Sequence, residues 1–141
     1  MKCRDIMSKN LEWLTETDTV LKAATVMAEA GVGFLPICDA HKRVIGVVTD
    51  RDLAVRAVAN GRDPNRTAVV EAMTPELVYA LEEQGIDDAV ELMREHEIRR
   101  LPIVDDRRRL VGIVALADLA TRSGATMASE ALEGVSKPRL G

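Results

Sequence analysis

Thr49, Asp50 and Asp52 are the side chains whose types and spacing best fit ligand chemistry in this sequence. They follow the apolar run Val44–Val48 and precede a new apolar pattern that begins at Leu53, which predicts a strand ending where a helix begins. A helix start carries unpaired N–H groups and the positive end of the helix dipole, so an anionic, hydroxyl-rich ligand could bind there. A capping box formed by Thr49 and Asp52 explains the same spacing without a ligand, and it does not exclude one.

The stretch that carries these residues occurs twice. Gly46–Leu53 reads GVVTDRDL, and Gly112–Leu119 reads GIVALADL, 66 residues later. At this offset, residues 7–56 and 73–122 share 17 identical pairs without a gap. The chain is therefore a tandem duplication of one unit.

Each copy has the hydrophobic pattern of a β-α-β-β-α unit. In the first copy we expect a strand over 10–16, a helix over 18–30 capped by Asp18, strands over 34–38 and 43–48, and a helix over 50–60 that Gly61 ends. In the second copy we expect helix 86–96, strands 100–104 and 110–114, and helix 116–122. Gly31 and Gly33 are interpreted as the end of the first helix.

So few strands leave an apolar sheet face uncovered in each copy. We therefore expect an α+β fold in which the two copies pack sheet to sheet about a pseudo-twofold axis. The expected domains are repeat 1 over 1–66 and repeat 2 over 67–123, followed by a frayed or disordered tail over 124–141.

Composition limits the function classes. The net charge of −4 and the aromatic content of 2% argue against nucleic-acid binding as the main activity. The sequence contains no apolar run of membrane-spanning length and no leader, so we expect a cytoplasmic protein. Cys3, Cys38, His41 and His96 lack the close spacing of a zinc site, and we expect no metal. No nucleophile motif or P-loop is present, so we expect no enzymatic activity.

Three duplicated motifs give the sequence a family resemblance. These are DIMS and EAMT at Asp5–Ser8 and Glu71–Thr74, FLPI and RLPI before the two hairpins, and the GVVTDRDL and GIVALADL stretches. In this order the motifs resemble a tandem pair of CBS domains, also called a Bateman module, over about residues 3 to 122. The sequence is similar to small stand-alone bacterial CBS pairs, because no catalytic, channel or transporter sequence accompanies the motifs.

The resemblance implies binding of adenosine-containing ligands (AMP, ADP, ATP, NAD or S-adenosylmethionine) in clefts between the repeats. The family's ribose and phosphate motif corresponds to Gly46, Thr49 and Asp52, with Asp50 beside them. The second copy matches this motif at Gly112 and Asp118 but has Ala115 at the hydroxyl position, so the two clefts are not equivalent. Backbone near Ser8 and the apolar residues around Pro36, including Ile37, resemble the family's adenine slot. The remaining ligand-binding candidates are Thr74, Pro102 and Ile103 at the equivalent positions of the second copy, and Arg99 and Arg100, which lie where the family often places phosphate contacts.

The function implied is regulatory: an adenine nucleotide acts as a ligand that shifts the geometry of the pair, with no catalytic cofactor. A homodimer of pairs is expected, since apolar helix faces stay uncovered. The downstream protein partner is left open. The alternative is a stress-response interaction scaffold that binds no nucleotide and keeps the motif for capping and core packing, a reading that Ala115 favours.

Overall fold

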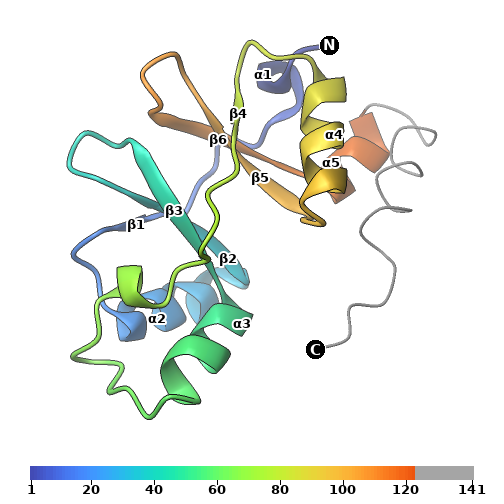
Figure 1. The fold of residues 1–141 in the computed structure, drawn as a ribbon. Helices are drawn as coiled ribbons and strands as arrows, with labels where there is room; N and C mark the ends of the chain where they lie inside the picture. The colour runs from blue at the N-terminus through green and yellow to red at the C-terminus, as the bar shows by residue number, and fades with distance from the viewer. Residues whose placement is uncertain (123–141) are drawn as a thin grey trace. The chain divides into compact units, whose positions relative to one another are not determined.

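The sequence forms two three-stranded sheets with helices against them, in a computed structural model that describes residues 1–122 and the side chains of residues 1–119 (Figure 1). The chain divides into two compact units, which we name by their place in the sequence. The central unit is Glu12–Leu77, and the terminal unit combines Met1–Leu11 with the described residues 78–122. The predicted α+β class is confirmed, and the expected tail over 124–141 lies outside the described residues.

The central unit is built on a mixed sheet with the strand order β1-β2-β3. Strand β1 (Leu14–Thr15) pairs in parallel with β2 (Phe34–Cys38), and β2 pairs antiparallel with β3 (Val44–Thr49). Its helical elements are α2 (Val20–Ala30), α3 (Asp50–Asp52), the π-helix η1 (Leu53–Val58) and the 3-10 helix η2 (Val69–Glu71). Helix α2 packs on both β2 and η1, which encloses a core of aliphatic side chains.

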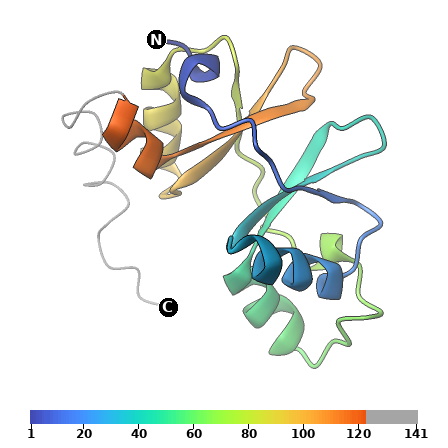
Figure 2. The same cartoon turned by 180° about the vertical axis from the view of Figure 1, so that it is seen from behind.

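The terminal unit repeats this plan with the order β4-β5-β6. Its strands are β4 (Ala80–Leu81), β5 (Arg100–Val104) and β6 (Leu110–Ala115), and its helices are α1 (Cys3–Ile6), α4 (Ile86–Glu95) and α5 (Leu116–Arg122). Helix α4 contacts β5, while α1 contacts both β6 and α5. Figure 2 shows the same ribbon from behind. Among the described residues, no helix combines the length and the apolar character that crossing a membrane requires.

The first eight residues of the chain belong to the fold of the second repeat. The Ile86 amide at the start of α4 donates to the Met1 carbonyl at 2.9 Å. Ser8 pairs with Ile113 of β6 through two backbone hydrogen bonds of 2.8 and 3.0 Å. The Ile6 side chain is fully buried in the terminal core. Residues 1–8 therefore fill one side of a unit whose other parts lie about 70 or more residues later in the chain.

Residues 67–74 occupy the corresponding place in the central unit. The Val20 amide at the start of α2 donates to the Thr67 carbonyl at 2.9 Å, and the Thr74 amide donates to the Val47 carbonyl of β3 at 2.9 Å. Val69 is fully buried in the central core. Each unit thus receives its leading segment from the other side of the sequence repeat, an arrangement that the periodicity alone does not reveal.

Two local predictions in the first copy are wrong. The strand expected over 10–16 is formed only by Leu14–Thr15, because only these two residues pair with β2. The cap of α2 is Thr19 rather than Asp18: the Thr19 hydroxyl accepts the Lys22 amide at 3.1 Å. The Asp18 carboxylate instead accepts the Thr15 amide at 2.8 Å and closes the turn after β1.

The helix after β3 begins at Asp50 as predicted, but its hydrogen bonding changes after one turn. Leu53–Val58 is a π-helix, and the pattern continues in the bond from the Ala59 amide to the Ala54 carbonyl at 2.9 Å. Gly61 ends the segment with φ of 69°, as the sequence predicted for a left-handed terminator. The strand predicted over 43–48 starts and ends one residue later. Strand 100–104 and helix 116–122 are confirmed.

Both hairpins are closed by an aspartate that binds its own turn. The Asp39 carboxylate accepts the His41 and Arg43 amides at 2.8 and 3.0 Å and the Arg43 guanidinium at 2.8 Å. Asp105 makes the same three contacts in the second hairpin, with Arg109 in the place of Arg43. Partial burial acts to raise the pKa of each carboxyl, but the donors together outweigh it and lower both pKa values.

These lowered pKa values make fold stability depend on pH in the acid range. A carboxyl whose folded pKa is depressed stabilises the fold above its unfolded pKa of about 3.9, and this stabilisation is lost as pH falls through the folded pKa. In urea unfolding from pH 6 to pH 3, we expect the Asp39→Asn, Asp105→Asn double variant to lose less stability than the wild type. Asp106→Asn, an exposed neighbour, is the control. Parallel curves for the wild type and the double variant would contradict the assignment.

Candidate ligand-binding site

A capping box joins β3 to the helix that follows it. The Thr49 amide donates to Asp52 Oδ2 at 2.9 Å, and the Asp52 amide donates to Thr49 Oγ1 at 3.1 Å. This reciprocal pair is the structural role that the spacing predicted for these residues. It fixes the Asp52 carboxylate at the end of the strand, because two hydrogen bonds hold the side chain and its own backbone.

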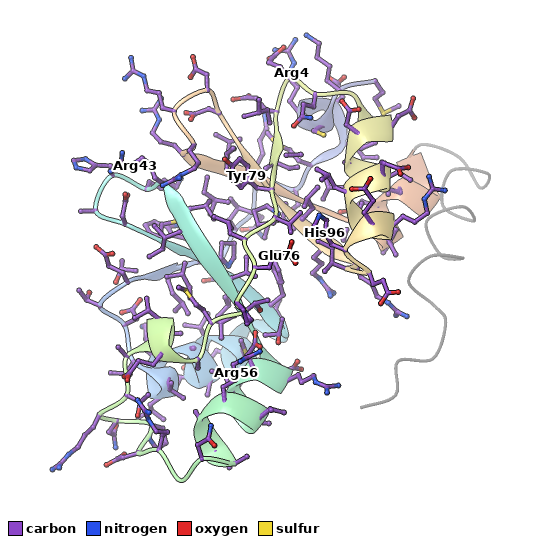
Figure 3. The ribbon with its side chains drawn as sticks, in the orientation of Figure 1. Arg4, Arg43, Arg56, Glu76, Tyr79 and His96 are labelled. Atoms are coloured by element: carbon purple, nitrogen blue, oxygen red, sulfur yellow. The ribbon has the colours of Figure 1, made fainter. Side chains whose placement is uncertain are left out.

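Asp52 has two further partners, which come from outside the turn. The Thr74 hydroxyl donates to Oδ2 at 2.6 Å, and the Arg56 guanidinium donates to Oδ1 at 3.2 Å. Figure 3 labels Arg56 on the helical segment after β3. The Asp52 residue is only 8% exposed. A buried carboxylate is stable only when it is hydrogen-bonded, and here the main-chain amide, the hydroxyl and the cation meet that need.

The motif glycines have a packing role in both units. A Cβ atom at Gly46 would lie 2.6 Å from the Met73 sulfur, and one at Gly112 would overlap the Met7 side chain. The residue after each methionine pairs with the strand: Thr74 with β3 and Ser8 with β6. The glycines therefore let the leading segment lie directly on the strand, which explains their spacing without a ligand.

Asp50 lies against Gly33 at the start of β2. The Asp50 amide donates to the Gly33 carbonyl at 3.0 Å, and Asp50 Oδ2 lies 2.7 Å from the position that a Cβ on Gly33 would take. Gly33 was interpreted only as a helix terminator, yet Gly31 alone has the left-handed backbone, with φ of 68°. Gly33 and Arg56 were thus not predicted as neighbours of the site. The signal in the sequence for the contact of Gly33 with Asp50 was that the second copy differs at both positions, with Arg99 in place of Gly33 and Leu116 in place of Asp50.

The second copy places different side chains at the same positions. The Leu116 amide donates to the Arg99 carbonyl at 3.1 Å, as Asp50 does to Gly33. Arg99 and Arg100 are exposed, Asp118 is partly buried in the first turn of α5, and Ser8 is exposed beside β6. The terminal unit therefore brings together the candidates Ser8, Arg99, Arg100, Gly112 and Asp118 around the end of β6.

The proposed adenine-slot residues on β2 and β5 lie inside the sheets. Ile37 and Ile103 are fully buried in the two cores, and Pro36 and Pro102 beside them are also buried. Side chains of successive strand residues point to opposite faces, so the prolines face away from the isoleucines. The isoleucines thus serve the core, and contact with an adenine by any of these four residues stays a prediction.

The two cysteines are buried thiols. Burial raises the pKa of Cys3 and the pKa of Cys38 to about 11 each, so both are protonated and weakly nucleophilic at neutral pH. Within residues 1–119, no group of three or more His, Cys, Asp or Glu side chains is arranged to hold a metal ion.

This duplicated geometry can be compared with known proteins. The family model of the CBS domain matches residues 3–58 and again residues 69–124. The chain belongs to the CBS-domain family. The second match begins at Val69, so Thr74 belongs to the second CBS domain by sequence while it binds Asp52 of the first.

Two curated bacterial relatives resemble this CBS pair over most of their length. The CBS domain-containing protein YhcV of Bacillus subtilis is 40% identical over 138 residues, covering 97% of this chain and 96% of that protein. Hypoxic response protein 1 of Mycobacterium tuberculosis is 38% identical over 117 residues, covering 83% and 81%.

Solved CBS pairs share the fold. A structure of hypoxic response protein with two coordinated zinc ions has a TM-score of 0.80 at 36% identity, covering 86% of this chain and 98% of that one. The CBS pair of MJ0100, solved with 5′-methylthioadenosine and S-adenosylmethionine, has a TM-score of 0.73 at 30% identity, covering 86% and 94%. Protein PAE2072 of Pyrobaculum aerophilum, complexed with AMP, has a TM-score of 0.77 at 26% identity, covering 97% and 100%.

Proposed function

We propose that this CBS pair is a nonenzymatic regulatory module that binds adenosine-containing ligands at Asp52 and Asp118 and transmits a conformational change. The support is chemical and comparative. A fixed carboxylate can accept hydrogen bonds from both ribose hydroxyls. The similar CBS pairs of MJ0100 and PAE2072 are complexed with S-adenosylmethionine and with AMP.

The observation that carries the proposal is the set of contacts around Asp52. Of the described residues, only Arg56 donates to Oδ1, and its side chain is 43% exposed. The exposed Arg56 guanidinium can move into solvent when a ribose hydroxyl donates to Oδ1 in its place, so the buried carboxylate stays hydrogen-bonded. The two capping-box bonds with Thr49 keep the carboxylate in position while the ligand binds.

The Thr74 contact also offers a route for the response. Thr74 lies in the segment that leads into β4 of the terminal unit, and its hydroxyl shares Oδ2 with the Thr49 amide. A ligand hydroxyl that binds Oδ2 competes with Thr74 and loosens this segment from Asp52. Ligand binding at the first repeat would then be felt at the start of the second.

We further propose a homodimer of pairs. Leu21 on α2 and Val55 and Val58 on η1 are exposed apolar side chains, with Val58 68% exposed, and the two helical elements contact each other. Contact with a second copy would remove this apolar surface from water. Light scattering is expected to give twice the mass of one chain, and a monomer would count against the dimer.

The scaffold alternative keeps a specific observation in its favour. The capping box, the bond from Thr74 and the packing of both glycines account for the motif without any ligand. In that case the module acts through protein contacts alone.

Titration calorimetry with AMP and S-adenosylmethionine separates the two functions. The isosteric change Asp52→Asn keeps the side-chain volume but removes the charged acceptor. Because a hydrogen bond to a charged group contributes about 1.5–3 kcal/mol, we expect the variant to bind these ligands roughly 10- to 100-fold more weakly. Asp118→Asn tests the second site in the same way, and Asp106→Asn is the matched control. Binding that both site variants retain unchanged would overturn the assignment, and the absence of binding to the wild type would favour the scaffold.

A further inference from the structure

We propose that the two sites divide adenosyl ligands by charge. The site at Asp118 takes a ligand with a 5′-phosphate, and the site at Asp52 takes an adenosyl ligand whose 5′ substituent is uncharged or cationic. This inference rests on the proposed function and concerns its ligand specificity.

The two sites can be compared residue by residue because equivalent backbone atoms form the same hydrogen bond in both. The Asp50 amide binds the Gly33 carbonyl at 3.0 Å, and the Leu116 amide binds the Arg99 carbonyl at 3.1 Å. The strand registers agree as well: Phe34 lies opposite Thr49 in one hairpin as Arg100 lies opposite Ala115 in the other.

The central site carries a second carboxylate, Asp50, next to the end of β3. Asp50 is exposed, its Oδ2 lies over Gly33, and its Oδ1 accepts the Arg51 amide at 2.8 Å. Among residues 1–119, no Lys, Arg or His side chain forms an ion pair with Asp50. Asp50 therefore adds a negative charge beside Asp52, and this charge opposes the binding of a ligand phosphate.

Gly33 leaves room for this arrangement. A Cβ at this position would come within 2.7 Å of Oδ2, so the Asp50 carboxylate could not keep its present position beside a side chain there. The second copy carries a side chain there, Arg99, and has Leu116 in place of the acid. The two exchanges are therefore linked: one copy has glycine with an acid, and the other has a cation with an apolar residue.

The terminal site has a cation, Arg100, beside Ala115, the residue that replaces the threonine of the first copy. Arg100 lies directly opposite Ala115 across the antiparallel pair, where cross-strand Cβ atoms are about 4.5–5.5 Å apart. Arg99 and Arg100 are exposed, and neither forms an ion pair with a described side chain. A guanidinium in this place can bind phosphate oxygens with two parallel hydrogen bonds, which a threonine hydroxyl cannot do.

Calorimetry on the full chain tests this division with AMP and with uncharged methylthioadenosine as probes. Each site is measured alone, using Asp118→Asn to isolate the central site and Asp52→Asn to isolate the terminal one. At the central site we expect methylthioadenosine to bind about 10-fold or more tightly than AMP, a difference of about 1.4 kcal/mol. Asp50→Asn should remove this preference by strengthening AMP binding.

At the terminal site we expect the opposite preference. Arg100→Gln should weaken AMP about 10-fold and leave methylthioadenosine unchanged, since only AMP carries the phosphate. Thermal melting of each variant verifies that it is folded. The division would be overturned, while the proposed function stands, if the ratio of AMP affinity to methylthioadenosine affinity were equal at the two sites. It would also be overturned if Asp50→Asn and Arg100→Gln left these affinity ratios unchanged. If the wild type binds neither probe nor S-adenosylmethionine, both proposals fail.

Discussion

Replacing Ile6 by alanine is expected to destabilise the terminal unit and spare the central unit. Ile6 precedes every element of the central unit in sequence, yet it is fully buried in the terminal core with Ile86, Val90 and Leu101. Truncation of a fully buried isoleucine costs about 2–5 kcal/mol, because the lost burial is accompanied by a cavity. This loss should fall on the terminal unit, since no part of the Ile6 side chain belongs to the central core.

Amide hydrogen exchange followed by mass spectrometry locates the loss. In Ile6→Ala, peptides from 86–119 should exchange faster, while peptides from 20–58 keep the protection of the wild type. Val69→Ala is the crossed control: Val69 is fully buried in the central core, so its truncation should expose 20–58 first. Faster exchange of 20–58 in Ile6→Ala, with 86–119 unchanged, would show that the leading segments are not exchanged between the units.

Gly112→Ala is expected to destabilise the protein by about 1–3 kcal/mol, the usual cost of inserting a methyl group into a packed interior. The new Cβ would lie 2.9 Å from the Met7 Cβ, in addition to its overlap with the outer atoms of that side chain. The Met7 backbone cannot move away freely, because the next residue, Ser8, is held by its two hydrogen bonds to Ile113. Urea unfolding monitored by circular dichroism measures the loss.

Gly46→Ala is the matched control for this variant, because the same motif position meets a softer neighbour. There the new Cβ would lie 2.6 Å from the Met73 sulfur but 3.6 Å or more from the next two atoms of that side chain, so a rotation of the flexible end relieves the contact. Gly46→Ala should therefore cost less than Gly112→Ala. In double variants, Met73→Ala should remove the steric overlap caused by Gly46→Ala fully. Met7→Ala should remove the overlap caused by Gly112→Ala only in part, since the Met7 Cβ remains. Equal losses in the two glycine variants would contradict this account.

The sequence was sufficient to predict the repeat, the family and the strands of both hairpins, because these features depend on local pattern. The alternation and turn chemistry around Asp39 and Asp105 define both hairpins. The capping box of Thr49 and Asp52 is likewise a contact between residues three positions apart. Such short-range signals are present in the order of residue types alone.

The contacts that complete the site were not predictable in this way. Thr74 reaches Asp52 across 22 positions, and Asp50 lies over Gly33, which directly precedes β2. Thr74 was predicted only as a ligand-binding residue equivalent to Ser8, and no side-chain partner was predicted for it. These contacts depend on the exchange of the leading segments, which a periodic sequence permits but does not require. The linked changes from Gly33 and Asp50 to Arg99 and Leu116 were the one visible trace of such a contact.

The central claim is that adenosyl ligands bind at the end of β3 and at the end of β6. The most direct measurement is a proton–nitrogen NMR titration of the full chain with AMP and with methylthioadenosine. We predict the largest ligand-induced shifts at the amides of Thr49, Asp52 and Thr74, or at those of Ala115 and Asp118, and we expect these shifts to become smaller in the corresponding Asn variant. Spectra that stay unchanged at millimolar ligand, or shifts confined to other parts of the chain, would contradict it.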